Sequence, residues 1–314
     1  MEKIAFVFPG QGSQTVGMGK ELYEQFAVAK AVFDAADEAL GFSITNMCFN
    51  GPEDELRKTS NTQPAILTVS IACYEVLKAH GITPNIVAGH SLGEYSALVV
   101  AGALSFSDAV QLVHKRGQLM QEAVPLGEGS MAAILGLERQ TVIDICQKAQ
   151  AEFGAVQAVN FNCPGQIVIA GKKEAVEKAS ELLKAAGAKR AIMLPVSAPF
   201  HSTLMKPAAE KLAIELSTIT VNDANIPVVS NIHGQINISG SDIEEALIEQ
   251  ADHPVEWEEC VAQIIRYGAT AFVEIGPGKV LSALTKKITK EINILNVEDS
   301  ISFQKTLDYF KEVN

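Results

Sequence analysis

A serine between two glycines is the pattern in this chain that most clearly suggests chemistry. Ser91 forms a Gly-x-Ser-x-Gly motif with Gly89 and Gly93, after the apolar segment 86–89 and before a helix-like segment. Here the chain must turn sharply from strand to helix, and the glycines remove Cβ atoms that would clash. Free N–H groups at the helix N-terminus would stabilise a developing oxyanion. The motif predicts Ser91 as a nucleophile, with the N–H of Leu92 as one oxyanion donor.

A serine nucleophile needs a base, and the chain has six histidines. His201 is the best candidate, because it lies at an expected domain junction and opens a helical pattern over 202–216. His90 is a poor base, since neighbours across such a turn point apart. No acidic residue stands out between Ser91 and His201 to complete a Ser–Asp–His order, which speaks against a plain esterase. Structural or surface positions are expected for His80, His114 and His253.

Composition indicates an ordinary globular protein. The chain has 314 residues, of which 47% are hydrophobic and 20% charged, and its net charge is −12. The negative charge disfavours nucleic acid as a partner, and an acidic partner would need a local basic patch. No run of about 18 apolar residues suggests a membrane span, and the N-terminal strand pattern is too short for a signal peptide.

The five cysteines are odd in number and widely scattered, without zinc-binding spacing. This usage is typical of buried free thiols in a reducing compartment, so we expect a cytoplasmic protein without a metal.

The alternation of short apolar runs with helical patterns predicts an α/β protein with a largely parallel sheet. One stretch differs, because its order is strand, helix, two strands, helix and strand, as in a ferredoxin-like unit. We therefore predict an inserted subdomain at 127–197 and a core made of 1–126 and 198–314, with hinges at 125–129 and 197–199. The expected core strands are 4–8, 86–89, 226–231, 271–275 and 292–297, and the main core helices are 63–80 and 93–103. The inserted unit is expected to have strands at 130–137, 156–161, 167–170 and 190–196, helices at 140–152 and 174–186, and a turn at 162–166.

Three motifs together resemble one enzyme family. They are Gly-His-Ser-Leu-Gly-Glu at 89–94, Phe-Pro-Gly-Gln-Gly-Ser-Gln at 8–14 and Ser-Ala-Pro-Phe-His at 197–201. In this order they resemble the malonyl-CoA:acyl carrier protein transacylases of fatty acid synthesis, over residues 4 to about 297. The resemblance implies an α/β-hydrolase-like core with an inserted ferredoxin-like subdomain. It also implies a ping-pong reaction, in which Ser91 takes the malonyl group and passes it to the phosphopantetheine thiol of acyl carrier protein.

The same resemblance assigns further residues to the site. His201 would act as base and then acid, oriented by the backbone carbonyl of Gln250 rather than by a carboxylate. The N–H of Gln11 would be the second oxyanion donor. Without the resemblance, the glycine-rich turn at 9–12 is a plain tight turn, because it fits neither nucleotide-binding template.

Arg116 is the expected selector of the acyl group. Malonate carries a free carboxylate, which a guanidinium can hold with two parallel hydrogen bonds. On sequence alone, a solvated helix arginine is the favoured alternative. In related polyketide synthase (PKS) acyltransferases a phenylalanine at the position of Phe200 marks malonyl selectivity, since its bulk fills the space of an α-methyl group. Met120 and Val196 are further candidates for lining the pocket.

Carrier docking would need basic residues, because acyl carrier protein is acidic. We expect the clusters Lys189–Arg190 and Lys286–Lys287 to flank the cleft, although solvated lysines are nearly as good an explanation. The expected protein is a monomer that binds malonyl-CoA and the carrier transiently, without a cofactor.

Three alternatives remain open. The protein could be a stand-alone acyltransferase serving a PKS, a serine hydrolase of acyl thioesters, or a non-catalytic docking protein of this fold. Arg116 speaks against the hydrolase, and the full set of Ser91, His201 and Arg116 speaks against the docking protein.

Overall fold

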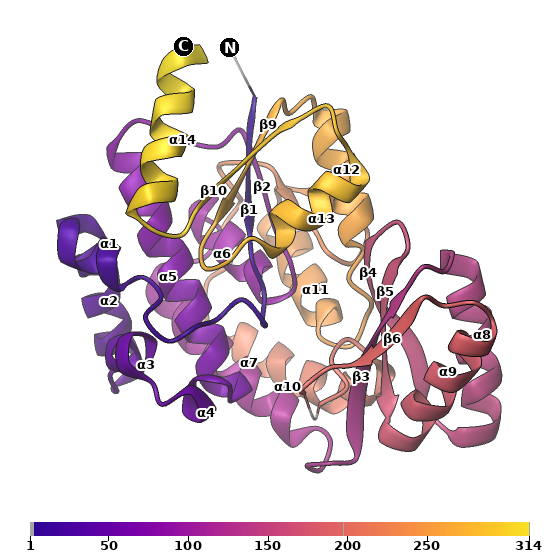
Figure 1. The fold of residues 1–314 in the computed structure, drawn as a ribbon. Helices are drawn as coiled ribbons and strands as arrows, with labels where there is room; N and C mark the ends of the chain where they lie inside the picture. Colours follow the sequence, from indigo (N-terminus) through magenta and orange to yellow (C-terminus); the bar gives the residue numbers. More distant parts are fainter. Residues whose placement is uncertain (1–2, 197, 314) are drawn as a thin grey trace.

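The computed structural model describes residues 3–196 and 198–313. Ser197, part of the expected hinge, of the third motif and of the predicted domain boundary, lies outside them. In this described part the chain forms one sheet of six strands and one of four (Figure 1). The boundary at 127–197 stays a prediction, although the four-stranded sheet runs from Gly129 to Met193.

The larger sheet is mainly parallel, as predicted. Its order is β10-β9-β1-β2-β7-β8, and β8 alone pairs antiparallel, with β7. The strands are β1 (Ile4–Phe8), β2 (Ile86–Gly89), β7 (Val228–Val229), β8 (Ile236–Asn237), β9 (Ala271–Ile275) and β10 (Asn293–Val297).

Helices surround this sheet (Figure 1). They are α1 (Lys20–Gln25), α2 (Ala27–Leu40), α3 (Ile44–Asn50), α4 (Glu53–Leu56), α5 (Thr59–Ala79), α6 (Leu92–Val100), α7 (Phe106–Glu122), the 3₁₀ turn η1 (Thr203–Met205), α10 (Lys206–Leu216), α11 (Gly240–Gln250), α12 (Trp257–Tyr267), α13 (Val280–Ile288) and α14 (Ser300–Val313).

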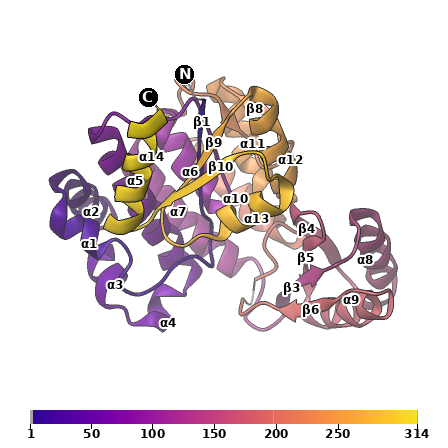
Figure 2. The same cartoon turned by 45° about the horizontal axis from the view of Figure 1, so that its top comes forward.

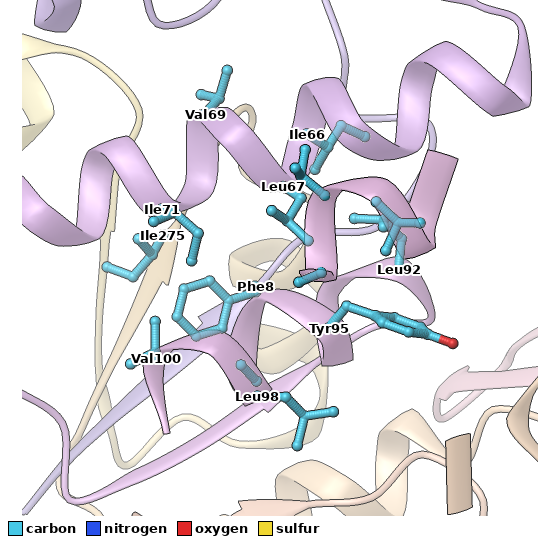
Figure 3. Close-up of a cluster of buried hydrophobic side chains, with 14 of the residues drawn as sticks. Phe8, Ile66, Leu67, Val69, Ile71, Leu92, Tyr95, Leu98, Val100 and Ile275 are labelled. Carbon is cyan, nitrogen blue, oxygen red and sulfur yellow. The ribbon is translucent and has the colours of Figure 1, made fainter. Parts of the chain in front are cut away.

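Alternate residues of β1 enter two different cores. Phe6 and Phe8 pack in a core that includes α5 and α6, whereas Ala5 and Val7 pack in a core that includes α12 and α13. Figure 3 shows Phe8 among apolar side chains of α5, α6 and β9. Burial on both faces is characteristic of a parallel sheet covered by helices, and it explains why β1 is apolar throughout.

The smaller sheet confirms the predicted βαββαβ order. Its strands pair antiparallel in the order β4-β5-β3-β6. The elements are β3 (Gly129–Leu135), α8 (Arg139–Phe153), β4 (Val156–Cys163), β5 (Gln166–Lys172), α9 (Lys173–Ala185) and β6 (Arg190–Met193). This unit has its own apolar core between sheet and helices, and it lies to one side of the larger sheet (Figure 2).

Strand β4 joins the two sheets through hydrogen bonds with the main chain of Val255. Phe161 N donates to Val255 O at 2.9 Å, and Val255 N donates to Val159 O at 2.8 Å. Because β4 is thereby paired with a segment of the larger unit, the face of the smaller sheet is held next to the end of β2.

Several predicted element bounds were wrong. The strand predicted over 226–231 is reduced to Val228–Val229, where Pro227 has no N–H to pair. The strand predicted over 190–196 ends at Met193, because the chain then leaves the sheet and places Leu194 and Val196 at a pocket. The turn predicted over 162–166 is shorter, since β4 and β5 continue to Cys163 and Gln166.

Helix bounds also differ from the predictions. The helix predicted from residue 63 begins at Thr59, with Pro64 inside it. Proline cannot donate to the carbonyl four residues earlier, that of Ser60. His114 Nδ1 donates to this carbonyl instead, at 2.7 Å, so His114 is structural, as predicted. The helix predicted over 93–103 is Leu92–Val100, and the pattern at 202–216 starts as a 3₁₀ turn before α10.

Gly117 allows α7 to lie close to α5. A Cβ atom on Gly117 would lie 2.6 Å from both Ser60 Cα and Thr59 O. We expect Gly117→Ala to lower the free energy of unfolding by about 1–3 kcal/mol, because the helices must separate. The gain in helix propensity, about 1 kcal/mol, only reduces this loss.

Urea unfolding followed by circular dichroism measures the effect. Ser107→Ala, an exposed change on the same helix, is the control and should stay within about 0.5 kcal/mol of the starting protein. Equal stability of the two variants would contradict the close-packing argument.

Candidate active site

Ser91 lies in a strained turn between β2 and α6. Its φ is 52° and its ψ is −108°, and only Ser91 and His201 have positive φ among the described non-glycine residues. A Cβ on Gly89 would lie 1.9 Å from Gly93 C, and one on Gly93 would lie 2.0 Å from Phe8 O. Both glycines are therefore required for the turn, which agrees with the motif analysis.

Asn231 holds the turn from the neighbouring strand end. Ser91 N donates to Asn231 Oδ1 at 2.6 Å, and Asn231 Nδ2 donates to Gly89 O at 2.6 Å. The asparagine is fully buried. No role was predicted for this residue, although its place at the end of the strand predicted over 226–231 was a usable signal.

Ser91 contacts His201, and His201 contacts Gln250. The distance from Ser91 Oγ to His201 Nε2 is 2.7 Å, and His201 Nδ1 donates to the backbone oxygen of Gln250 at 2.8 Å. With Nδ1 protonated, Nε2 is free to accept the serine proton. The acceptor behind the imidazole is thus a main-chain carbonyl, the arrangement that the resemblance implied.

Burial keeps His201 neutral. Only 2% of the residue is exposed. Desolvation, followed by the nearby charge of Arg116, lowers the pKa of His201 from 6.5 to about 3. A neutral imidazole at physiological pH has the protonation state that a general base needs.

Arg116 is buried beside the serine. Its Nη2 donates to Ser91 Oγ at 3.2 Å and to Gln250 Oε1 at 2.8 Å, and its Nη1 donates to Gln63 Oε1 at 2.8 Å. The alternative of a solvated helix arginine is therefore wrong, because α7 turns this side chain inward and only 1% of the residue is exposed.

A pocket at Ser91 gathers most of the predicted residues. Besides Ser91, His201 and Arg116, it is lined by Gln11, Leu92, Met120, Val196 and Phe200. Leu92 is the first residue of α6, so its N–H has no acceptor within the helix. The smaller sheet adds Met131 and Asn160, and α5 adds Gln63; the sequence analysis missed these three. They come from distant segments without a motif of their own.

Glu94 is a buried carboxyl group behind the pocket. Its Oε2 accepts from Gln250 Nε2 at 2.6 Å and from Asn231 N at 3.2 Å. Burial raises the pKa of Glu94 to about 7. This residue was part of the quoted motif, but no role was predicted for it.

The basic clusters lie at one end of the smaller sheet. Lys189 and Arg190 are exposed at the start of β6. Lys286 and Lys287 are exposed near the end of α13, where Lys287 Nζ donates to Gln166 Oε1 at 2.9 Å. Lys189 N donates to Leu135 O and Gly136 N donates to Gly165 O, both at 2.8 Å, so both clusters lie near the β4–β5 turn. Their docking role stays a prediction.

His90 also lines the pocket at Ser91. Its Nε2 is hydrogen-bonded to Asn162 Oδ1 at 2.9 Å and not to Ser91, so His90 is not the base. Residues 3–196 and 198–313 contain no cluster of three or more potential metal-ligating His, Cys, Asp or Glu side chains. No helix of this described part is long and apolar enough to span a membrane.

We expect the reactivity of Ser91 toward a fluorophosphonate to show no inflection near pH 6.5, because His201 stays neutral down to about pH 3. The measurement is the labelling rate between pH 5 and 8. At pH values between about 3 and 6.5, His201 is neutral in the folded protein but protonated in the unfolded chain. Its contribution to the stability of the fold therefore falls as the pH drops from 6.5 toward 3.

Glu94→Gln is the control for this profile, because Glu94 titrates near pH 7. An inflection that disappears in this variant belongs to Glu94. An inflection near pH 6.5 that persists in Glu94→Gln would contradict the neutral state of His201.

Known proteins share both the sequence and the fold. A family model described as acyl transferase domain matches residues 5–310. The malonyl CoA-acyl carrier protein transacylase of Bacillus subtilis (strain 168) is 54% identical over 314 residues, which is 100% of this chain and 99% of that protein.

Two solved structures give the same result. An acyl carrier protein S-malonyltransferase from Vibrio cholerae has a TM-score of 0.94 and 49% identity, covering 97% of this chain and 99% of that one. A malonyl-transacylase in complex with its type II PKS acyl-carrier protein has a TM-score of 0.95 and 46% identity, covering 98% and 99%. With matches over nearly its whole length, the chain belongs to the acyl transferase family and, within it, to the malonyl CoA-acyl carrier protein transacylases.

Proposed function

We propose that this protein transfers the malonyl group of malonyl-CoA to the phosphopantetheine thiol of acyl carrier protein, through a malonyl ester on Ser91. One observation carries the proposal. Ser91 Oγ lies 2.7 Å from a neutral imidazole nitrogen and 3.2 Å from a buried guanidinium nitrogen. A base and a carboxylate-binding cation thus meet at one hydroxyl group, as a malonyl acceptor requires.

In the first half-reaction, Ser91 Oγ attacks the thioester carbonyl while His201 Nε2 takes the hydroxyl proton. The N–H groups of Leu92 and Gln11 hold the oxyanion. When the tetrahedral intermediate collapses, the carbon–sulfur bond breaks, and CoA leaves as a thiol with the proton from His201. In the second half-reaction the carrier thiol gives its proton to His201 and attacks the ester, and Ser91 recovers the proton.

The backbone carbonyl of Gln250 acts in both half-reactions. It orients the imidazole through Nδ1 and stabilises the imidazolium that forms during each proton transfer. A carbonyl carries no net charge, so it raises the basicity of the imidazole less than a carboxylate would. A weaker base is sufficient for this dyad, because its thioester substrates are already activated.

Selectivity for malonyl would come from Arg116. Its guanidinium can bind the free carboxylate, and acetyl would leave this buried charge without that anion. Phe200 lies next to His201 in the same pocket, where its ring would fill the space of an α-methyl group. Such steric discrimination is worth only about 1–3 kcal/mol, and Met120 and Val196 would complete the apolar wall.

The carrier would be acyl carrier protein, docked through Lys189, Arg190, Lys286 and Lys287. Service to a PKS remains a second candidate, since one matching structure is a malonyl-transacylase with its type II PKS acyl-carrier protein. The groups named above supply every proton transfer, so the proposed reaction needs neither metal nor cofactor. A monomeric state and a cytoplasmic location stay predictions from the sequence.

Mixing the protein with malonyl-CoA should give a malonyl adduct on the intact protein, with little adduct from acetyl-CoA. Ser91→Ala should give neither adduct, because the acceptor oxygen is missing. Mass spectrometry of the intact protein measures both.

Other outcomes separate the alternatives. CoA release without an adduct would indicate a hydrolase, and an equal acetyl adduct would contradict the selecting role of Arg116. If neither adduct nor CoA appears and a fluorophosphonate does not label Ser91, the non-catalytic alternative would be favoured.

The double change Lys286→Glu and Lys287→Glu should slow malonyl transfer to acyl carrier protein by about tenfold, because two attractive charges become repulsive. Malonylation of Ser91 by malonyl-CoA should change far less. The two half-reactions are measured separately, by carrier mass and by enzyme mass.

The matched control is Lys305→Glu with Lys311→Glu on α14, which changes the net charge equally at two exposed positions. An equal slowing of transfer in both double variants would mean that only net charge matters. An unchanged transfer rate in the α13 variant would refute docking there.

A further inference from the structure

The charge of Arg116 raises an electrostatic problem. Its guanidinium donates hydrogen bonds to neutral oxygens of Gln63, Gln250 and Ser91. Among the described residues, no carboxylate lies within 4.0 Å of its guanidinium nitrogens. A buried cation without a compensating charge is costly, so the structure must supply one at longer range.

Glu94 is the acid that lies behind Arg116, one residue away in the hydrogen-bond chain. It is 3% exposed, and its Oε2 accepts from Gln250 Nε2 at 2.6 Å. Gln250 Oε1 in turn accepts from Arg116 Nη2 at 2.8 Å. The side-chain amide of Gln250 therefore separates the carboxylate from the guanidinium.

The partners of Gln250 allow one orientation of its amide. Nε2 faces two acceptors, Glu94 Oε2 and Ser91 O at 3.0 Å, whereas Oε1 faces a donor. If the amide were flipped, its NH₂ group would face the guanidinium N–H of Arg116. Its oxygen would then face the oxygens of Glu94 and Ser91. Because this side chain is fully buried, no water could compensate for either conflict.

We propose that Glu94 is a positioning residue for acyl selectivity, and this inference rests on the proposed function. Glu94 fixes the Gln250 amide so that a neutral oxygen holds Arg116 beside Ser91, while the carboxylate compensates the positive charge from one residue away.

The separation of the Glu94 carboxylate from the Arg116 guanidinium has a chemical consequence. A direct ion pair between Glu94 and Arg116 would occupy the guanidinium and compete with the malonyl carboxylate. With the amide in between, the guanidinium stays charged and in place, yet its carboxylate-binding edge is not taken by a protein anion. Gln250 thus has two separate functions: its backbone carbonyl orients His201, and its side chain holds Arg116.

The test is the ratio of malonyl to acetyl adduct formation on Ser91 in Glu94→Gln, measured at pH 8, where Glu94 with its pKa of about 7 is mostly ionised. Both adducts form on the same serine in one preparation, so the ratio cancels any general loss of folding or serine reactivity. We expect the ratio to fall by about tenfold, the effect of weakening one hydrogen bond to a charged group. Glu249→Gln, the same chemical change on α11, should stay within about twofold of the starting ratio.

A double-mutant cycle tests the chain of contacts. Gln250→Met deletes the amide and should also lower the ratio. In that background Glu94→Gln should lower it much less than in the unaltered protein, because only the longer-range charge effect remains. If the two losses multiply instead, Glu94 does not act through Gln250, and the inference is overturned.

The result also separates this inference from the proposed function. Absence of a malonyl adduct in the unaltered protein would reject the function itself. A selective unaltered protein with an unchanged ratio in Glu94→Gln would reject only the role of Glu94. If Glu94→Gln does not fold, Gln250→Met alone decides, since an unchanged ratio there overturns the inference and a lowered ratio supports it.

Discussion

The strained turn at Ser91 is the constraint on which the site depends. Its positive φ needs glycines at 89 and 93, and a Cβ on Gly10 would lie 2.5 Å from His90 O, so a third glycine lets the N-terminal loop approach. The strain is held by contacts from elsewhere, above all the two hydrogen bonds of Asn231. The hydroxyl is thereby presented to His201 before any substrate binds.

A second constraint is the burial of charge. Burying Arg116 makes its interaction with an anion strong, but it also requires compensation in the absence of that anion. The structure distributes this task over neutral oxygens and the more distant Glu94, whose raised pKa of about 7 reflects its own desolvation. With the role proposed for Glu94, selectivity and stability of the site would be coupled through Gln250.

The smaller sheet completes the pocket because it is attached at several points. Besides the pairing of β4 with Val255, Arg139 makes a bidentate ion pair with Glu256, with both N···O distances at 2.6 Å. The guanidinium carbon of Arg139 also lies 3.6 Å from the centre of the Phe161 ring. These contacts hold Asn160 and Met131 opposite Ser91.

The sequence by itself determined the local features of this protein. The turn at Ser91 follows from glycine spacing, and the order of strands and helices follows from apolar periodicity, because both are set by neighbouring residues. Only the tertiary structure decided that Arg116 points inward and that Asn231 and Glu94 reach the site. These outcomes depend on contacts between segments more than 130 residues apart, such as Glu94 with Asn231 and with Gln250. No local pattern encodes such contacts, since burial and charge compensation are properties of the packed chain.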